Sequence, residues 1–497
     1  MSSSAIDLPT AEAIARYEPV IGLEVHVQLA TATKIFCGCP TSFGAPPNTN
    51  VCPVCMGLPG ALPVLSREAV ELAIKGGLSL KCRIRPQSRF ARKNYFYPDL
   101  PKGYQISQYD EPLAEHGYVD IEVDGVRKRI GVTRVHMEDD AGKSIHDGFK
   151  DSDRFSYVDL NRCGTPLIEI VSEPDLRSSD EAYAYLTELK KVLQFVEVST
   201  CDMEKGHLRC DANVSVRLKG AEKFGTKAEV KNLNSFRFLK QALDYEIARQ
   251  VKVIEAGGRI VQETRLYNPD LGETFGMRSK EDAHDYRYFP EPDLLPLRVS
   301  EKWLGEVQAS MPELPAKKRT RFLEVYGLRE YDADVLTATR PASEYFETVA
   351  KVSGDPKTAA NWVMGDLMAL LKAEGKEIAE SPVTADALGQ LVGLIAKGEI
   401  SGKLAKEIFA KMFATGDSAA AIIEREGLKQ ISDTAALESI ILEVIANSPK
   451  QVEQYLGGKT TVINFLVGQA MRATRGQANV AVVTELLKQK LGGGEKC

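Results

Sequence analysis

Four cysteines lie close together near the start of the chain, in a spacing that is typical of a metal site. Cys37 and Cys39 form a C-x-C pair, and Cys52 and Cys55 form a C-x-x-C pair, with twelve residues between the two pairs. Two thiolate pairs joined by a turn-rich loop can surround a zinc ion tetrahedrally and leave no coordination position open. We therefore expect a structural zinc knuckle over 37–55, with four reduced thiols in a tight loop as the alternative.

An imidazole and several carboxylates form a second group with chemical potential. In GLEVHVQL (22–29), Glu24 and His26 alternate with apolar residues, so both side chains lie on one face of a predicted strand. In TRVHMEDDAGKS (133–144), Glu138 and Asp139 stand next to Asp140, where their charges repel one another unless solvent or cations neutralise them. Magnesium with ATP is one interpretation, since Mg²⁺ takes oxygen ligands; a solvated strand face and acidic turn are the other.

Further acidic residues extend this group. Glu169 lies between Ile168 and Ile170, where burial is costly unless a cation pairs with the carboxylate. Glu204 and Asp211 flank a short turn, and Lys143 follows the acidic run. The chain has no P-loop, because Met137 occupies the place of the first glycine before Gly142-Lys143-Ser144. Any ATP phosphates would have to be held by a metal ion and by basic side chains.

Basic residues at the end of the chain suggest contact with nucleic acid. From Lys450 to Cys497 there are seven Lys and Arg against three acidic residues, although the whole chain has a net charge of −6. Arg472 and Arg475 lie one helical turn apart in this segment. A basic helical end suits RNA phosphates, and an ordinary solvated helix face remains open.

The elements that must position these residues can be read from periodicity. Strands are predicted over 20–29, 208–218 and 259–267, with a hairpin turning at Asp124-Gly125. Helices are predicted over 66–75, stopped by Gly76-Gly77, over 180–195 and over 235–256. Strands and helices do not alternate regularly, which favours an α+β fold with an antiparallel sheet. Beyond the Pro-rich segment 289–299 the pattern becomes helical.

This pattern predicts three parts: 1–297 as an α+β domain, 298–415 as a helical domain and 416–497 as a small helical module. Apolar residues make up 43% of the chain and charged residues 27%, as in soluble globular proteins. No apolar run is long enough to span a membrane, and the first residues resemble neither a secretory signal nor a transit peptide. We expect a cytoplasmic protein.

Several long motifs follow one another in a fixed order along the chain. They are IGLEVHVQL (21–29), KNYFYPDLPKGYQISQYD (93–110), HMEDDAGK (136–143), DLNRCGTPLIEIVSEPD (159–175), RCDANVSV (209–216), KAEVKNLNS (227–235), DYRYFPEPDL (285–294) and VGQAMRATRGQAN (467–479). In this order they resemble the B subunit of the aspartyl/glutamyl-tRNA(Asn/Gln) amidotransferase, and the resemblance covers essentially the whole chain.

The resemblance implies a fold, a reaction and partners. The N-terminal part would be a cradle-shaped domain and the tail a tRNA-binding module, with Arg472 and Arg475 as candidate contacts. The chain would use Mg²⁺ and ATP to phosphorylate the side-chain carboxylate of Glu or Asp on misacylated tRNA(Gln) or tRNA(Asn). Ammonia from a partner glutaminase, the amidase A subunit, would displace the phosphate, and a small C subunit would complete a heterotrimer.

The resemblance also assigns residues. Glu24, His26 and Glu138 match positions around the magnesium site, and Asp211, Glu204 and Glu169 would complete the acidic pocket with Lys143 nearby. Asp139 stands where many members carry Glu, so its carboxylate is one methylene short of theirs. Cys37, Cys39, Cys52 and Cys55 match the members that bind zinc. A different class of function, a zinc-containing RNA-binding subunit without chemistry, would explain the cysteines and the tail and leave the acidic clusters unexplained.

Overall fold

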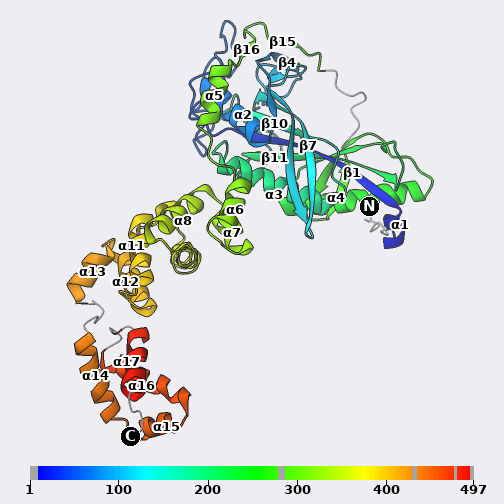
Figure 1. Ribbon diagram of the computed structural model, residues 1–497. Coiled ribbons are helices and arrows are strands. Elements are labelled where there is room, and N and C mark those ends of the chain that lie inside the picture. Colours follow the sequence, from blue (N-terminus) through cyan, green and yellow to red (C-terminus); the bar gives the residue numbers. More distant parts are fainter. Residues whose placement is uncertain (1–8, 278–285, 428–433, 475–477, 479, 493–497) are drawn as a thin grey trace. The chain divides into compact units, whose positions relative to one another are not determined.

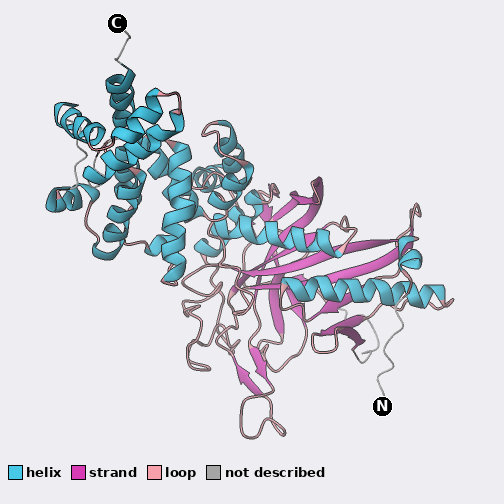
Figure 2. Ribbon diagram, turned by 90° about the horizontal axis from the view of Figure 1, so that it is seen from below, coloured by secondary structure: helices cyan, strands magenta, loops and turns pink. Residues whose placement is uncertain are grey.

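The computed structural model describes residues 9–277, 286–427, 434–474, 478 and 480–492 (Figure 1). The chain divides into two compact units, Met1–Leu314 and Pro315–Cys497. The strands belong to the first unit and the second is built from helices (Figure 2). The predicted α+β fold is therefore confirmed. Among the described residues, none of the helices combines the length and the apolarity that crossing a membrane requires.

A large sheet of nine strands forms the framework of the described part of the first unit. Its order is β14-β13-β12-β11-β1-β10-β7-β6-β2, and its neighbours run antiparallel except β12 and β13. The strands are β1 Tyr17–Gln28, β2 Arg83–Ile84, β6 Ala114–Val123, β7 Val126–Asp139, β10 Pro166–Ser172, β11 Leu208–Leu218, β12 Ala228–Lys231, β13 Thr264–Asn268 and β14 Glu273–Gly276. The first strand thus lies in the middle of the sheet, between β11 and β10.

Smaller sheets attach loops to this framework. Their strands are β3 Gln87–Ser88, β4 Phe90–Asn94, β5 Tyr104–Gln108, β8 Lys143–Ile145, β9 Tyr157–Asp159, β15 Phe289–Pro290 and β16 Leu297–Arg298. Strands β15, β4 and β5 pair in that order, β16 pairs with β3, and β8 pairs with β9. Residues 90–108, which are rich in aromatic and basic side chains, therefore form the hairpin β4-β5, and β4 also pairs with β15.

Helices cover one face of the large sheet. They are α2 Arg67–Ser79, α3 Ser179–Phe195 and α4 Phe236–Glu255, with short helices α1 Ala11–Ala15 and α5 Glu301–Ala309. Helices α3 and α4 pack side by side, α4 against β11 and α3 against β6 (Figure 1). Alternate residues of the central strands, such as Val25, Val27, Ile168 and Ile170, are buried on this face. The opposite face keeps the polar residues of the same strands.

Local sequence signals placed most of these elements. The predicted hairpin turns at Asp124 and Gly125, which both have positive φ, at 50° and 76°, as a two-residue turn requires. The Oγ atom of Ser235 accepts a hydrogen bond from the backbone N–H of Phe238 and caps α4. The strand predicted over 259–267 is shorter than expected, because β13 begins at Thr264.

The prediction that Gly76-Gly77 ends the helix over 66–75 is wrong. Helix α2 continues to Ser79, and both glycines are buried inside it. A Cβ atom at Gly77 would lie 2.9 Å from Ile84 Cδ1 and 3.0 Å from Ala114 Cβ. The glycines therefore allow the helix to approach the sheet closely, and this tertiary contact outweighs their low helix propensity.

The described residues of the second unit form two hydrophobic clusters. One runs from Phe322 to Ile423 and the other from Leu437 to Leu491. Its helices are α6 Pro315–Glu324, α7 Glu330–Leu336, α8 Arg340–Ser353, α9 Pro356–Asn361, a π-helix Trp362–Leu367, α10 Met368–Ala373, α11 Ala385–Ala396, α12 Gly402–Thr415, α13 Ala419–Glu426, α14 Thr434–Ala446, α15 Pro449–Leu456, α16 Ile463–Ala473 and α17 Val480–Gly492, with 3₁₀ turns at Ile378–Glu380 and Thr460–Val462. Helix α5 packs on the core of the first unit through Val307, and α13 on the first helical cluster through Ile422. The division at 297 and 415 stays a prediction.

Candidate active site

The polar face of the central strands brings together residues that are far apart in the sequence. Glu24 and His26 lie on one face of β1, as their alternation predicts. The antiparallel register places Glu169 of β10 opposite His26, and Asp211 of β11 opposite Glu24. Directly opposed residues in such a pair have Cβ atoms about 5 Å apart. Strand pairing alone therefore assembles the acidic pocket.

His26 lies between two carboxylates. Its Nε2 atom is 3.4 Å from Oε2 of Glu169 and 3.7 Å from Oε1 of Glu138. One ligand atom from each of the three residues lies within 4.8 Å of the others. The side chain of His26 is 21% exposed, whereas that of Glu138 is 2% exposed. An imidazole nitrogen and two carboxylate oxygens are metal-ligand atoms, so this group could hold a divalent cation from the solvent side.

A second histidine, His136, supports the same carboxylates from β7. Its Nε2 atom is 3.3 Å from Oε2 of Glu169 and 3.9 Å from Oε2 of Glu138. Burial alone would raise the pKa of Glu169, but the imidazoles of His136 and His26 hold that pKa well below its ordinary value. Burial likewise works against a charged His26, yet Glu169 and Glu138 raise its pKa. The two imidazoles thus favour an ionised Glu169 carboxylate.

A further group of charges continues along β11 and β12. The Nδ2 atom of Asn213 donates to Oε1 of Glu24 at 2.9 Å. Lys231 lies 2.8 Å from Asp211 and 2.8 Å from Glu229. Burial raises the pKa of Glu24, and the nearby charges of Glu169 and Glu229 raise it further. This end of the site therefore holds three carboxylates with one lysine.

A cavity of about 1030 Å³ lies over this face. The predicted residues His26, Glu138 and Asp211 line it, together with Lys143 and Glu204, which are exposed at its edge. Cations on its wall are Lys93, Arg162, Lys205, Arg209 and Lys231. Ligand pockets have volumes of roughly 300–1,000 Å³, so this cavity has room for more than one small group.

Asp140 joins two of these cations. Its carboxylate accepts from Nη2 of Arg209 at 2.9 Å and from Nε2 of Gln28 at 3.0 Å, and it lies 3.5 Å from Arg162. Burial would raise the pKa of Asp140, but the two guanidinium groups lower it overall. The Nε atom of Arg209 is buried without a hydrogen-bond partner among the described residues. Arg209 therefore has one unused donor below the surface, while its side chain lines the cavity.

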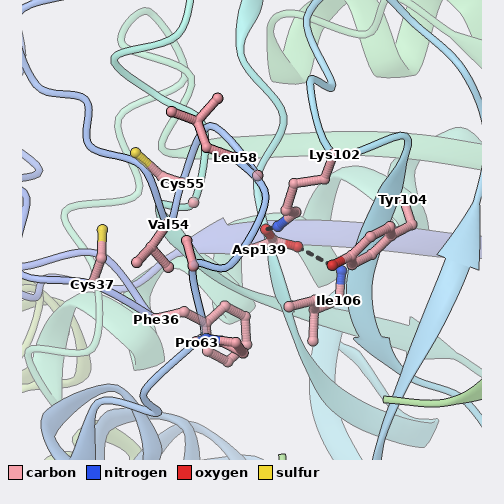
Figure 3. Close-up of a pocket in the computed structure, with 13 residues that line it drawn as sticks. Phe36, Cys37, Val54, Cys55, Leu58, Pro63, Lys102, Tyr104, Ile106 and Asp139 are labelled. Carbon is pink, nitrogen blue, oxygen red and sulfur yellow. Dashed lines mark hydrogen bonds and ion pairs between the residues drawn. The ribbon is translucent and has the colours of Figure 1, made fainter. Parts of the chain in front are cut away.

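Asp139 lies away from the other predicted ligands. Successive strand residues point to opposite faces, so Asp139 faces the other side of β7 from Glu138. Its carboxylate bonds to the ammonium group of Lys102 and accepts from the backbone N–H of Ile106 at 2.7 Å. A smaller cavity of about 120 Å³ borders this ion pair, beside Tyr104 (Figure 3). Asp139 is not in the metal-ligand group that contains His26.

The four cysteines of the predicted knuckle are brought together. The Sγ atoms of Cys37, Cys39, Cys52 and Cys55 lie within 4.8 Å of one another. Thiolates around zinc stand about 3.8 Å apart, given a Zn–S distance of roughly 2.3 Å, so the donor set fits that metal. A hydrogen bond from Cys37 lowers the Cys55 pKa to about 4, with help from the fully buried ammonium of Lys34, which lies 3.5 Å from Sγ of Cys55.

The predicted contacts for nucleic acid lie in the second unit. Arg472 is exposed in the last turn of α16. Arg475 lies outside the described residues. The structure therefore leaves the role of both arginines as a prediction.

Several residues of the site were not among those predicted from the sequence. His136, Lys93, Arg209, Glu229 and Lys231 all face the same side of the sheet or line its cavity. Period-2 spacing was a usable signal for His136 with Glu138, and for Glu229 with Lys231. Arg209 became recognisable only through the pairing of β11 with β1, whereas Lys93, on β4 of a smaller sheet, lines the cavity.

Comparison with known proteins gives full-length matches. The family described as "GatB/GatE catalytic domain" matches residues 19–305, and the "GatB domain" matches residues 344–491. The B subunits of the aspartyl/glutamyl-tRNA(Asn/Gln) amidotransferases from Geotalea daltonii and Geobacter sulfurreducens are each 57% identical, over 96% of this chain and 100% of theirs. The protein of the same name from Carboxydothermus hydrogenoformans is 55% identical over 96% of this chain and 99% of its own.

Proposed function

Because the chain belongs to the family of aspartyl/glutamyl-tRNA(Asn/Gln) amidotransferase B subunits, we propose that it activates a misacylated tRNA with ATP. The side-chain carboxylate of Glu on tRNA(Gln), or of Asp on tRNA(Asn), attacks the γ-phosphorus and ADP leaves. Ammonia then attacks the acyl phosphate, phosphate departs as the leaving group, and the product is an amide. The activation is needed because a carboxylate has no good leaving group, whereas an acyl phosphate has one.

The observation that carries this proposal is the convergence of His26, Glu138 and Glu169 beside a cavity with cationic walls, which His26 and Glu138 line. These residues come from three neighbouring strands, and one ligand atom of each lies within 4.8 Å of the others. They would hold Mg²⁺, which when bound neutralises charge on the transferring phosphoryl group. Glu24 and Asp211 lie beside them and would complete the acidic pocket.

The cavity's own cations would hold the phosphates. Phosphoryl transfer depends on positioning and on charge stabilisation more than on covalent help from the protein. Arg209, Lys231 and Lys93 all line this cavity. Lys143 and Glu204 stand at its edge, where they would contact the outer part of a substrate.

The remaining assignments follow from the family and the site together. The four cysteines would bind a structural zinc ion. Asp139 would form an ion pair with Lys102 and would not bind the magnesium ion. The amidase A subunit would supply ammonia from glutamine and the C subunit would complete the heterotrimer, in the cytoplasm. Arg472 and Arg475 would contact tRNA.

The test is the reaction of the assembled enzyme. The chain is purified with A and C subunits and given glutamine, ATP and either Glu-tRNA(Gln) or Asp-tRNA(Asn). We expect ADP and amidated tRNA in equal amounts, with no amidation when ATP is omitted. Amidation without ATP would overturn the proposal. So would tRNA binding without any chemistry, the result expected of a non-catalytic RNA-binding subunit.

A further inference from the structure

The loop between the two cysteine pairs forms part of the wall of the large cavity. Residues 41–45 line it next to the turn 203–207. The side chain of Phe43 is 66% exposed, and its ring meets that of His207 edge-on, with centroids 6.1 Å apart and an interplanar angle of 85°. When a flat group covers an exposed aromatic ring, apolar surface is removed from water and the free energy of the complex falls.

This loop is anchored at its far side. The backbone N–H of Asn48 donates to Oδ1 of Asp159 at 3.0 Å, and that of Asn50 donates to Oδ1 of Asn161 at 2.8 Å. Asn161 in turn donates from Nδ2 to the carbonyl of Pro46 at 2.7 Å. The buried ammonium of Lys34 holds the carbonyl of Asn50 at 2.6 Å. Phe43 is thus presented on a loop whose course is fixed by hydrogen bonds.

The partner ring is fixed as well. The Nδ1 atom of His207 lies 2.6 Å from Oγ1 of Thr200. Burial lowers the pKa of His207, which favours the neutral imidazole near pH 7. A neutral, oriented imidazole nearly perpendicular to the phenyl ring holds that exposed ring in place, with Lys205 next to it on the same wall.

We propose that the phenyl ring of Phe43, which the His207 ring contacts nearly at a right angle, is the platform on which an adenine base stacks when substrate occupies the cavity. This inference rests on the proposed function, since both substrates of that reaction carry adenine. One is ATP, and the other is the terminal adenosine to which the amino acid is esterified. Aromatic side chains stack on bases through their faces, which makes such a platform suitable for either source.

Phe43 is a positioning residue in this scheme. Its ring lies on the wall formed by the knuckle loop, whereas the proposed reacting groups gather around His26. Loss of stacking should therefore weaken substrate binding and leave the chemical step nearly unchanged. The KM of one adenine-bearing substrate would rise, and kcat would change little.

The experiment uses the assembled heterotrimer and measures KM separately for ATP and for Glu-tRNA. Phe43→Ala should raise one KM at least tenfold with kcat within about twofold, since base stacking is lost. Phe43→Trp should restore that KM, and His207→Ala should raise the same KM. Phe224→Ala is the matched control, because Phe224 is 57% exposed on the loop between β11 and β12 and is not a lining residue of the cavity.

The KM that rises identifies the source of the adenine. A rise for ATP assigns the platform to the nucleotide, and a rise for Glu-tRNA assigns it to the terminal adenosine. If neither KM differs from that of Phe224→Ala, or if Phe43→Trp does not restore what Phe43→Ala loses, the platform is refuted. A wild-type enzyme without ATP-dependent amidation would instead refute the proposed function, so the two failures are distinct.

Discussion

His26 and Glu169 lie directly opposite each other in the antiparallel register of β1 and β10, with Nε2 and Oε2 3.4 Å apart. The two residues are far apart along the chain. Glu138 reaches the same imidazole from β7. The magnesium site that we propose therefore depends on the pairing of three strands rather than on any short motif.

The first prediction concerns this group. Replacing His26 by Ala removes one of three proposed ligands and should lower ATP-dependent amidation more than about hundredfold. Binding of tRNA, measured by filter retention, should stay within about threefold of the wild type. The same separation is expected for Glu24→Ala.

Glu18→Gln serves as its control. Glu18 lies on the same strand and the same face as His26 but pairs with Arg217, 2.6 Å away. This variant should keep its amidation activity. Full amidation by the His26→Ala enzyme would show that the group does not serve ATP-dependent activation.

The second prediction concerns the cysteines. Cys39→Ser should lose bound zinc, measured as metal content after dialysis, because one of four thiolates is removed. Cys82→Ala is the control, since Cys82 is buried in the hydrophobic core of the first unit and is not one of the four clustered cysteines. Its zinc content should equal that of the wild type. Equal zinc in both variants would mean that the knuckle holds no metal through Cys39.

The third prediction concerns the acid stability of the helical unit. Glu347 in α8 lies 2.7 Å from Lys318 and 2.6 Å from Arg321, both in α6. Burial opposes ionisation of Glu347, but these two cations lower its pKa. Glu347→Gln should therefore reduce the free energy of unfolding by about 1–3 kcal/mol at pH 7.

The sign follows from the lowered pKa. An ionised Glu347 stabilises the fold above its unfolded-state pKa of about 4.3, and this contribution disappears as the pH falls through the lower folded-state pKa. The difference between variant and wild type should shrink below pH 4. This difference in the free energy of unfolding can be measured by urea unfolding at each pH, with the fluorescence of the buried Trp362 as the signal in a Trp303→Phe background. A difference that is constant with pH would contradict the ion-pair origin.

The fourth prediction concerns the tail. Ending the chain after Gly427 removes the hydrophobic cluster from Leu437 to Leu491 and leaves the cluster from Phe322 to Ile423 whole. We expect tRNA affinity to fall at least tenfold and to depend less steeply on salt, because basic contacts with phosphates are lost. Amidation with ammonia at saturating tRNA should persist. Unchanged affinity would assign tRNA binding to the rest of the chain.

The sequence by itself determined the features that depend on neighbouring residues. The alternation of GLEVHVQL made a strand with Glu24 and His26 on one face, and the spacing of four cysteines predicted a cluster that the structure assembles. Ser235 marked the start of α4 and Asp124-Gly125 the turn of a hairpin. Such signals are local because capping, turn geometry and strand parity involve only a few consecutive residues.

Only the tertiary structure decided which of these residues meet. It brought His136 and Arg209 to the site, and it separated Asp139 from its neighbour Glu138 by placing them on opposite faces of β7. It also carried α2 through Gly76-Gly77, where a close approach to the sheet favours glycine. The register between distant strands sets these contacts, and that register follows from packing a whole sheet against its helices, which no local pattern specifies.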